Sequence, residues 1–329
     1  MFVIHSVQFI IVQLIQDFEI KEMISIDEKI KKMNGVIGVI NTPFTDSNEI
    51  DVPSLKRYVD YYIENGVVGF LVPAIAAEVN KLTYEERNLI VETVVEHVNG
   101  KVPVIGGASA EDQYKRIEYV KRLNSIGCDG VLVNINFVDE ESFIKQIDEI
   151  SNEEPGFLVI QDWDFHGYGI PIETIVKIFE SNEYFKSYKI EVVPAGVKYT
   201  EIIKATGGKL HVSGGWASSQ MIEALDRGVN AFMSTILPDI YSRIFLLYSS
   251  GRREDAKLLF HQVLPVLAFS HQHPDISIHF NKRMVHKQGL YSTANVRQPI
   301  LPFDDHHRKV ADELIEYGIN LSKEIKEYL

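Results

Sequence analysis

The 329-residue chain has one cysteine and fewer basic than acidic residues, and each shortage argues against certain classes of protein. Its one cysteine, Cys128, excludes a disulfide within the chain and fits a reducing compartment, so we expect a cytoplasmic protein. Basic residues are fewer than acidic ones, 33 against 46, which gives a net charge of −13. This balance argues against a nucleic-acid partner, because binding to a phosphate backbone needs a positively charged surface.

The chain also lacks an apolar run long enough to cross a membrane. Residues 1–15 are almost all apolar, but a membrane-spanning helix needs about 20 residues. They have neither the basic start nor the small-residue cleavage site of a signal peptide. We therefore expect no membrane partner, and we interpret residues 1–33 as an N-terminal appendage to the fold.

What the chain does have is a regular alternation of short β-rich apolar runs with amphipathic segments of helical length. This alternation is typical of a parallel sheet covered by helices. Eight such units in about 210 residues favour the α/β class and a (β/α)8 TIM barrel over a doubly wound sheet, which usually has fewer strands. The predicted strands are 36–40, 69–72, 102–105, 130–133, 157–160, 187–191, 210–213 and 231–234, and the predicted helices include 52–65, 83–98, 111–125, 140–151, 172–179 and 221–226.

The pattern changes after residue 237. From there to residue 329 it is helical throughout, so we predict a barrel over residues 34–237 and a C-terminal helical subdomain over residues 238–329. Several histidines fall in this second part, but their spacing matches no known ligand set. We expect them to lie far from the barrel opening, and we predict neither a metal nor a cofactor.

Lys189 lies in the middle of a predicted buried strand. Lysine is almost never fully buried without a partner, because removing its ammonium from water costs several kcal/mol. The same cost lowers the pKa of such a lysine and yields the free amine that attacks a carbonyl to form a Schiff base. Glu191 follows on the same face of the strand as a possible charge partner. The plainer alternative is a lysine that reaches solvent at the strand end.

Several motifs, in sequence order, resemble those of the dihydrodipicolinate synthase / N-acetylneuraminate lyase family between about Gly35 and Pro299. Thr42-Pro43-Phe44 is similar to the opening motif of that family. Lys189-Ile190-Glu191 resembles the lysine strand of one of its subgroups. Further matches are Glu78 with its following Leu-Thr and Glu-Glu-Arg, Pro194-Ala195-Gly196, Ser213-Gly214, Met233-Ser234 and residues 296–299.

The resemblance implies a class I aldolase-type lyase in which Lys189 forms a Schiff base with a small 2-keto acid. It also implies a homodimer or a homotetramer. Backbone amides of a loop bind a carboxylate whatever side chains they carry. The implied substrate-binding residues are Thr42, Ile75, Ala76, Gln161, Asp162, Gly214 and Met233.

The departures from the family pattern concern its hydroxyl groups. Ala76 aligns with a threonine of the carboxylate loop, Gln161 with the tyrosine that ends the fifth strand, and Val138 with a tyrosine contributed by a neighbouring subunit. The family's three-hydroxyl relay is therefore absent. This favours, as one alternative, a barrel that binds a small ligand without turnover. A metal-dependent barrel hydrolase or isomerase is a second alternative, but it needs strand-end carboxylates and histidines that are few here.

Two further segments are candidates at the predicted barrel opening. The loop 161–168 offers two carboxylates, an imidazole and a phenol as acid–base groups, although such loop residues are often only caps or surface. Phe137 and Val138 form an apolar pair after the fourth strand. We expect this pair to contact a neighbouring subunit, because exposed apolar patches tend to mark interfaces.

Overall fold

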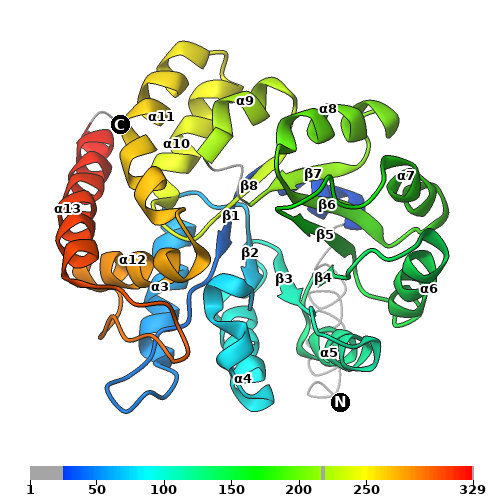
Figure 1. Cartoon of the computed structure of the whole chain (residues 1–329), viewed down its shortest axis with the longest axis horizontal. Helices are drawn as coiled ribbons and strands as arrows, with labels where there is room; N and C mark the ends of the chain where they lie inside the picture. The colour runs from blue at the N-terminus through cyan, green and yellow to red at the C-terminus, as the bar shows by residue number, and fades with distance from the viewer. Residues whose placement is uncertain (1–24, 216–218, 328–329) are drawn as a thin grey trace, which may run out of the picture.

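The structure, a computed structural model, describes residues 25–215 and 219–327. Within these residues eight parallel strands close into a barrel in sequence order, from β1 round to β8, with helices around the outside (Figure 1). The predicted (β/α)8 fold is confirmed. The strands are β1 (Gly35–Val39), β2 (Gly69–Val72), β3 (Val104–Gly107), β4 (Gly130–Asn134), β5 (Leu158–Asp164), β6 (Phe185–Val192), β7 (His211–Gly214) and β8 (Ala231–Ser234).

The helices that follow the first seven strands begin at polar caps in several cases. Asp51, Asp112 and Asp139 each accept a backbone N–H from the first turn of the helix that they precede, which satisfies donors that have no partner inside the helix. Thr83 and Glu86 form a reciprocal capping box. The helices are α3 (Val52–Glu64), α4 (Tyr84–Val98), α5 (Gln113–Ile126), α6 (Glu140–Ser151), α7 (Ile172–Ser181), α8 (Ala195–Ala205) and α9 (Met221–Asp226), with short 3-10 turns η1 (Ile75–Ala77) and η2 (Val79–Lys81) after β2.

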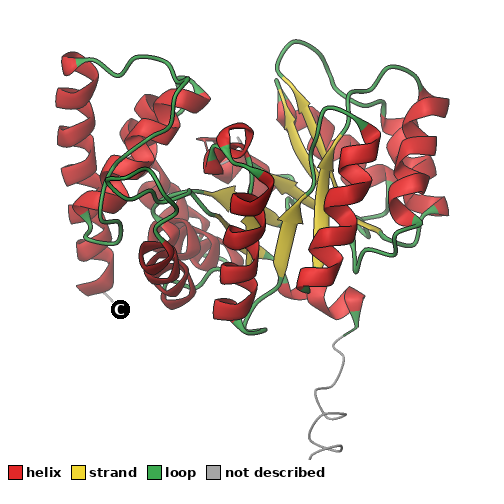
Figure 2. Ribbon diagram, turned by 90° about the horizontal axis from the view of Figure 1, so that it is seen from below, coloured by secondary structure: helices red, strands yellow, loops and turns green. Residues whose placement is uncertain are grey.

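The C-terminal helices gather on one side of the barrel, and Figure 2 shows them beside the strands where the C-terminus is marked. They are α10 (Pro238–Ser249), α11 (Arg253–Ser270), α12 (Pro274–Lys287) and α13 (Asp305–Glu327). The prediction that this part is helical throughout is wrong for residues 288–304, which form neither helix nor strand. None of the described helices is long and apolar enough to span a membrane.

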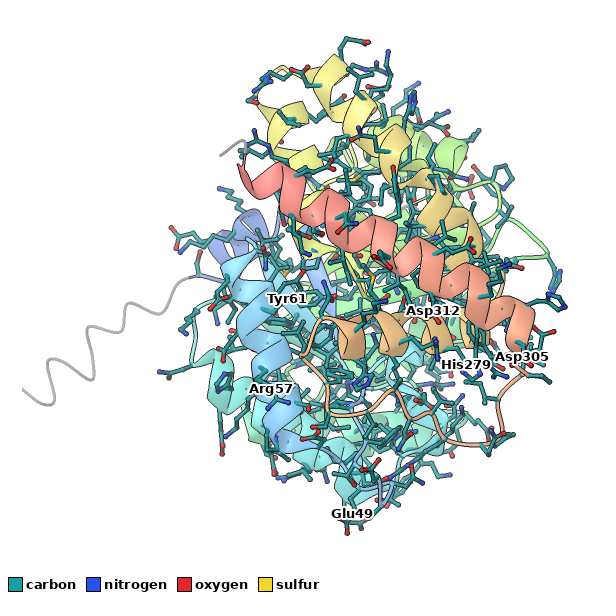
Figure 3. All side chains as sticks on the ribbon, turned by 90° about the vertical axis from the view of Figure 1, so that its left-hand side faces the viewer. Glu49, Arg57, Tyr61, His279, Asp305 and Asp312 are labelled. Carbon is teal, nitrogen blue, oxygen red and sulfur yellow. The ribbon has the colours of Figure 1, made fainter. Side chains whose placement is uncertain are left out.

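The irregular segment 288–304 runs against the barrel because its groups bond to the loop after β1 and to α3. Tyr291 donates its hydroxyl hydrogen to the Asn41 carbonyl oxygen at 2.7 Å. The Arg57 guanidinium donates to the Leu290 carbonyl oxygen at 3.1 Å. Figure 3 shows Arg57 and Tyr61 along α3, with Asp312 on α13 above α12. These bonds fix the segment over the outer edge of the barrel opening.

A short helix, α2 (Ile26–Lys32), lies at the amino ends of the strands. Met33, which follows it, is fully buried in the barrel interior, and its carbonyl oxygen lies 3.3 Å from Nε2 of His211. Lys29 forms an ion pair with Asp129 at 2.6 Å. We interpreted residues 1–33 as an N-terminal appendage; residues 25–33 contact the barrel, and residues 1–24 lie outside the described residues.

Side chains alternate along β5 and β6 between the barrel interior and the layer beneath the helices. In the parallel register Gln161 pairs with Lys189, and Trp163 pairs with Glu191. These four residues therefore share the inner face. The intervening Asp162 and its partner Ile190 share the outer face. The alternation decides which residues of the two strands reach the barrel opening.

Candidate functional site

A cavity of about 440 Å³ opens at the carboxyl ends of the strands. Its size is that of a small-molecule site, and its position is where (β/α)8 barrels carry their chemistry. Lys189 and Glu191 of β6 line it together with Gln161 and Trp163 of β5. The rest of its wall includes residues of the β2, β3 and β4 loops and of α11 and α12, so the barrel and the C-terminal helices build it together.

Lys189 is the central group of this cavity. It is 6% exposed, and its ammonium nitrogen lies 2.9 Å from Oε2 of Glu191, which is 4% exposed. The same oxygen accepts a hydrogen bond from the side-chain amide of Gln161 at 2.5 Å. The predicted pairing of Lys189 with Glu191 is confirmed. The carboxylate compensates the buried ammonium, and the amide fixes the orientation of the carboxylate.

Gly215 gives this pair its space. A Cβ atom at position 215 would lie 2.0 Å from Oε1 of Glu191 and 2.8 Å from Cε of Lys189, so either side chain would have to move. Gly215 lines the cavity, whereas its predicted neighbour Gly214, the last residue of β7, does not. The cavity contact expected for Gly214 thus falls on the next residue along the chain.

Asp162 does not line the cavity, contrary to our expectation of substrate contact. Strand alternation turns its carboxylate outwards, where it forms an ion pair with the fully buried Lys198. It also accepts hydrogen bonds from the Tyr188 hydroxyl and from the Ile170 backbone amide. Asp162 therefore ties the loop after β5 to α8.

Thr42 also stays outside the cavity lining. It is fully buried, and its hydroxyl donates to the Ala77 carbonyl oxygen at 2.7 Å. It therefore supports the loop after β2 from behind, which corrects the expectation of direct substrate contact. Of the predicted substrate-binding residues, those that line the cavity are Ile75, Ala76, Gln161 and Met233.

The loop after β2 places backbone N–H groups at the cavity. Ile75 and Ala76 open the 3-10 turn η1, whose internal bonds use the amides of Ala77 and Glu78 at 2.8 and 2.9 Å. The first amides of a helical turn have no partner within it and are available to an anion. Figure 1 shows this part of the chain at the carboxyl end of β2.

Glu78 holds that loop from below. It is 3% exposed, has a positive φ of 57°, and accepts a hydrogen bond from the Arg297 backbone amide at 2.8 Å. Its carboxylate also forms ion pairs with Lys81 and with the fully buried Lys282 of α12. Burial of Lys282 lowers its pKa to about 8, with Glu78 acting in the opposite direction. The geometry is that of a structural carboxylate joining the loop to the C-terminal subdomain.

His271 lines the cavity, which corrects our expectation that the C-terminal histidines lie far from the opening. It ends α11, and its Nδ1 lies 2.7 Å from the hydroxyl oxygen of Ser219. Burial lowers its pKa to about 4, so the imidazole is neutral at pH 7. No spacing in the sequence relates residue 271 to Lys189, because only the packing of α11 over the barrel brings them to one cavity.

Three other polar side chains of the cavity were not among the predicted substrate-binding residues. Arg116 of α5 resembles any helical arginine in the sequence, yet it is buried and faces the cavity. Asn134 ends β4 and donates to the Gln161 carbonyl oxygen at 3.0 Å. Asn281 of α12 donates to the Thr235 hydroxyl at 2.8 Å. Among the described residues, no group of three histidine, cysteine, aspartate or glutamate side chains is placed to hold a metal ion.

Most acid–base candidates of the loop 161–168 lie outside the cavity lining, and several have hydrogen-bond partners of their own. Asp164 accepts backbone hydrogen bonds from His166 and Gly167 at 2.9 and 2.8 Å, and these bonds hold its pKa below the ordinary value. The Tyr168 hydroxyl donates to Glu201. Among these residues Gln161 and Trp163 line the cavity, whereas Asp164, His166 and Tyr168 do not.

The apolar pair after β4 divides between two environments. The Phe137 ring packs against Phe143 of its own chain, with ring centroids 5.6 Å apart, whereas Val138 is 82% exposed. Phe137 is therefore not the exposed contact that we expected, and Val138 is the residue that projects from the surface. The homodimer or homotetramer implied by the sequence stays a prediction.

The closed barrel and the lysine-centred cavity define a (β/α)8 protein with a small-molecule site at the carboxyl ends of its strands. The sequence profile of the dihydrodipicolinate synthetase family matches residues 32–317. The chain belongs to this family, and membership supports a lyase of class I aldolase type.

Two curated relatives illustrate the range of the family. The chain is 26% identical over 302 residues to 4-hydroxy-tetrahydrodipicolinate synthase of Staphylococcus haemolyticus, a match covering 86% of this chain and 96% of that protein. It is 25% identical over 276 residues to L-2-keto-3-deoxyarabonate dehydratase of Azospirillum brasilense, covering 81% and 88%. These two relatives carry different activities at similar distance from this chain.

Solved structures share the fold. Dihydrodipicolinate synthase from Rhodopseudomonas palustris superimposes with a TM-score of 0.80 at 23% identity, covering 87% of this chain and 98% of that one. A structure described as the first monomeric dihydrodipicolinate synthase variant gives a TM-score of 0.79 at 23% identity, covering 88% and 97%. At this identity the likeness concerns the fold alone.

Proposed function

We propose that the protein is a lyase that binds a 2-keto acid as a Schiff base on Lys189. The observation that carries this proposal is the lysine itself, buried at a cavity on the carboxyl side of a barrel strand with Glu191 2.9 Å away. A buried amine beside a proton acceptor is what nucleophilic attack on a carbonyl requires. Lys198 is fully buried, but it is paired with Asp162 and does not line the cavity.

The carboxylate of the keto acid would bind the first amides of η1, those of Ile75 and Ala76. Both residues line the same cavity as Lys189. Backbone amides at the start of a helical turn attract anions without help from side chains. The loss of the threonine hydroxyls therefore leaves a carboxylate site in place, with Glu78 and Thr42 holding its loop from behind.

Glu191 would take the place of the absent hydroxyl relay. It accepts a proton from the Lys189 ammonium, and the free amine adds to the substrate carbonyl to give a carbinolamine. Glu191 then returns the proton to the carbinolamine hydroxyl, which leaves as water and gives the iminium. Gln161 cannot move a proton because its amide does not titrate, so its part is to orient Glu191.

From the iminium, Glu191 would remove a proton from the carbon next to the imine, C3, to give an enamine. The enamine then forms a bond to a second carbonyl compound or expels a hydroxyl from the neighbouring carbon as water. The first outcome is a carbon–carbon reaction, and the second a dehydration. Hydrolysis of the imine releases the product and restores Lys189. Both reaction types are compatible with the family, whose relatives named above are a synthase and a dehydratase.

Reductive trapping tests the proposal. The protein is incubated with pyruvate, 2-oxobutyrate or 2-oxoglutarate, reduced with borohydride, and mapped by peptide mass spectrometry. We expect one adduct, on Lys189, and none in Lys189→Arg. Lys204→Arg on the exposed side of α8 is the matched control and should trap as the wild type does. An adduct that persists in Lys189→Arg, or that maps to another lysine, would remove the basis of the mechanism.

A barrel that binds its ligand without turnover predicts a different result. Such a protein would bind the keto acid but would not exchange the C3 protons of the keto acid with solvent, because exchange needs both the Schiff base and a base at C3. Exchange measured in D2O therefore separates the lyase from a binding protein without knowledge of the physiological substrate.

A further inference from the structure

Arg116 is a buried cation that lines the cavity and has no carboxylate partner in the part of the chain that the structure describes. It lies in the first turn of α5 and is 6% exposed. Its Nη1 donates to the side-chain oxygens of Gln113 and Gln146 at 3.1 and 3.2 Å, and its Nη2 donates to the Glu111 carbonyl oxygen at 3.2 Å. Its Nε has no hydrogen-bond partner. All three of its acceptors are uncharged and at long distances for such bonds.

The other buried cations of the described residues are compensated. Lys189 forms an ion pair with Glu191, Lys198 with Asp162, and Lys282 with Glu78. No carboxylate of the described residues forms an ion pair with Arg116. Buried charges are normally paired, because an uncompensated one is strongly destabilising. Among the described residues, Arg116 is therefore the buried cation without an anionic partner. A bound anion would supply that partner.

The acidic groups nearest in sequence do not supply that partner. The Asp112 carboxylate accepts the Lys115 backbone amide at 2.8 Å as the cap of α5, and it lies 3.7 Å from the Lys115 ammonium. Glu111 is exposed, and Arg116 contacts its main-chain oxygen and not its carboxylate. Burial lowers the pKa of Arg116, with Asp112 opposing that change. Water screens both carboxylates, whereas the guanidinium is enclosed.

We propose that Arg116 binds a second carboxylate of the substrate, so that the natural substrate is a 2-keto acid with an anionic group remote from its carbonyl. A guanidinium recognises a carboxylate through paired N–H donors, which suits this role better than a lysine would. Ser109, Asn134 and Asn136 line the same cavity and carry no charge, and Glu111, which also lines it, is exposed, so water screens its carboxylate. That the substrate is a keto acid rests on the proposed function, whereas the binding of an anion by Arg116 does not.

The test compares two probes of similar shape. 2-Oxoglutarate has a distal carboxylate, and its 5-methyl ester has a neutral group in its place that cannot cyclise onto the ketone. In the wild type, the concentration for half-maximal borohydride trapping should be about 10- to 100-fold lower for the acid, the range for hydrogen bonds to charged groups. Arg116→Gln should remove this difference and leave trapping of pyruvate unchanged. Arg116→Lys, which keeps the charge, should retain part of it.

Arg122→Gln is the matched control. Arg122 lies on the same helix, pairs with Glu92 near the surface and does not line the cavity, so its removal should leave the preference for the acid intact. Equal trapping of acid and ester by the wild type would overturn the proposal. So would a loss in Arg116→Gln that affects pyruvate, acid and ester in the same proportion, because that is the result of a purely structural role.

A second readout separates this proposal from the Schiff-base chemistry. Glutarate and its monoamide have no carbonyl that Lys189 can attack, so their binding does not depend on the lyase mechanism. We expect glutarate to raise the melting temperature of the wild type more than the monoamide does, and Arg116→Gln to abolish the difference. If no keto acid is trapped, the proposed function fails, and this comparison alone decides on Arg116: equal shifts refute it.

Discussion

Glu191→Gln is the substitution that tests the proton-transfer chemistry most directly. It keeps the shape of the side chain and removes its ability to take a proton. In the protein Oε2 of Glu191 lies 2.9 Å from the Lys189 nitrogen and 2.5 Å from the Gln161 amide nitrogen. Both contacts are shorter than a water-mediated one, so no solvent molecule replaces the carboxylate at that point.

The expected magnitude follows from this contact. Removal of a positioned general base typically lowers a rate by about 10²–10⁴-fold, which corresponds to about 3–5 kcal/mol of activation free energy. The substitution also leaves Lys189 without its counter-charge in a site 6% exposed. Breaking a buried pair in this way lowers the free energy of unfolding by about 3–5 kcal/mol when the remaining partner stays charged.

The assay is proton NMR of pyruvate in D2O. The methyl signal of pyruvate disappears only if the keto acid forms a Schiff base and loses a C3 proton, so the rate of disappearance reports both steps. We expect Glu191→Gln to slow this exchange by about 10²–10⁴-fold, and to slow borohydride trapping of pyruvate on Lys189 as well, because Glu191 also takes the ammonium proton before the amine attacks. Glu118→Gln removes an exposed carboxylate of α5 and serves as the control with unchanged exchange.

Exchange at the wild-type rate in Glu191→Gln would show that another group moves the proton. Trapping of pyruvate at the wild-type rate in this variant would also contradict the assignment, since it would show that Glu191 takes no part in forming the Schiff base. Melting curves recorded for each variant ensure that exchange is compared between folded proteins.

Two further predictions concern Gly215 and His211. Gly215→Ala places a methyl group where the Glu191 carboxylate now lies. Pyruvate exchange should therefore fall by roughly 10²-fold, which is the cost of a misplacement near 1 Å. An unchanged exchange rate measured by NMR would contradict this positioning role. Burial lowers the pKa of His211 to about 4, so the unfolded chain takes up a proton first as the pH falls below 6.5. Stability should therefore be lost between pH 6.5 and about 4, by about 3 kcal/mol in all. Urea unfolding of the wild type and His211→Asn checks this, and equal pH slopes would refute it, since His271, also near 4, contributes the same to both.

Most of the barrel could be predicted because its strands read as short apolar runs. The predicted 69–72 and 231–234 coincide with β2 and β8. β5 continues four residues beyond its predicted end, to Asp164. The extra residues are polar or aromatic and carry no apolar run, and they are held in strand conformation by pairing with β6.

Some residues of the candidate site could be predicted from the sequence, and others could not. Lys189 could be predicted because a lysine within an apolar strand is conspicuous, and Glu191 because two residues separate it from Lys189 on one face. Asp162 was assigned to the site together with its neighbour Gln161. Successive side chains of a strand point to opposite faces, so Gln161 faces the cavity and Asp162 faces outwards. Arg116 and His271 could not be predicted, because their burial arises from packing between elements distant in sequence.

The irregular segment 288–304 escaped prediction for a related reason. Its residues are held by bonds from outside, such as those of Tyr291 to Asn41 and of Arg57 to Leu290. A local sequence pattern carries no information about hydrogen bonds to residues distant in the chain. The same holds for the contact of α2 with the base of the barrel, where Met33 is buried by strands that come later in the chain.

The ion pair between Glu78 and Lys282 has a consequence for the order in which the protein is completed during synthesis. Its two residues are 204 positions apart, so the amide loop after β2 leaves the ribosome long before the lysine that holds it. Domains begin to fold from the amino end while translation continues. A nascent chain that ends before α12 can close its barrel, but it carries Glu78 without its deepest partner. We therefore expect ligand binding to begin only after Lys282 has been made, and a product truncated before α12 to bind ligand more weakly than the full chain.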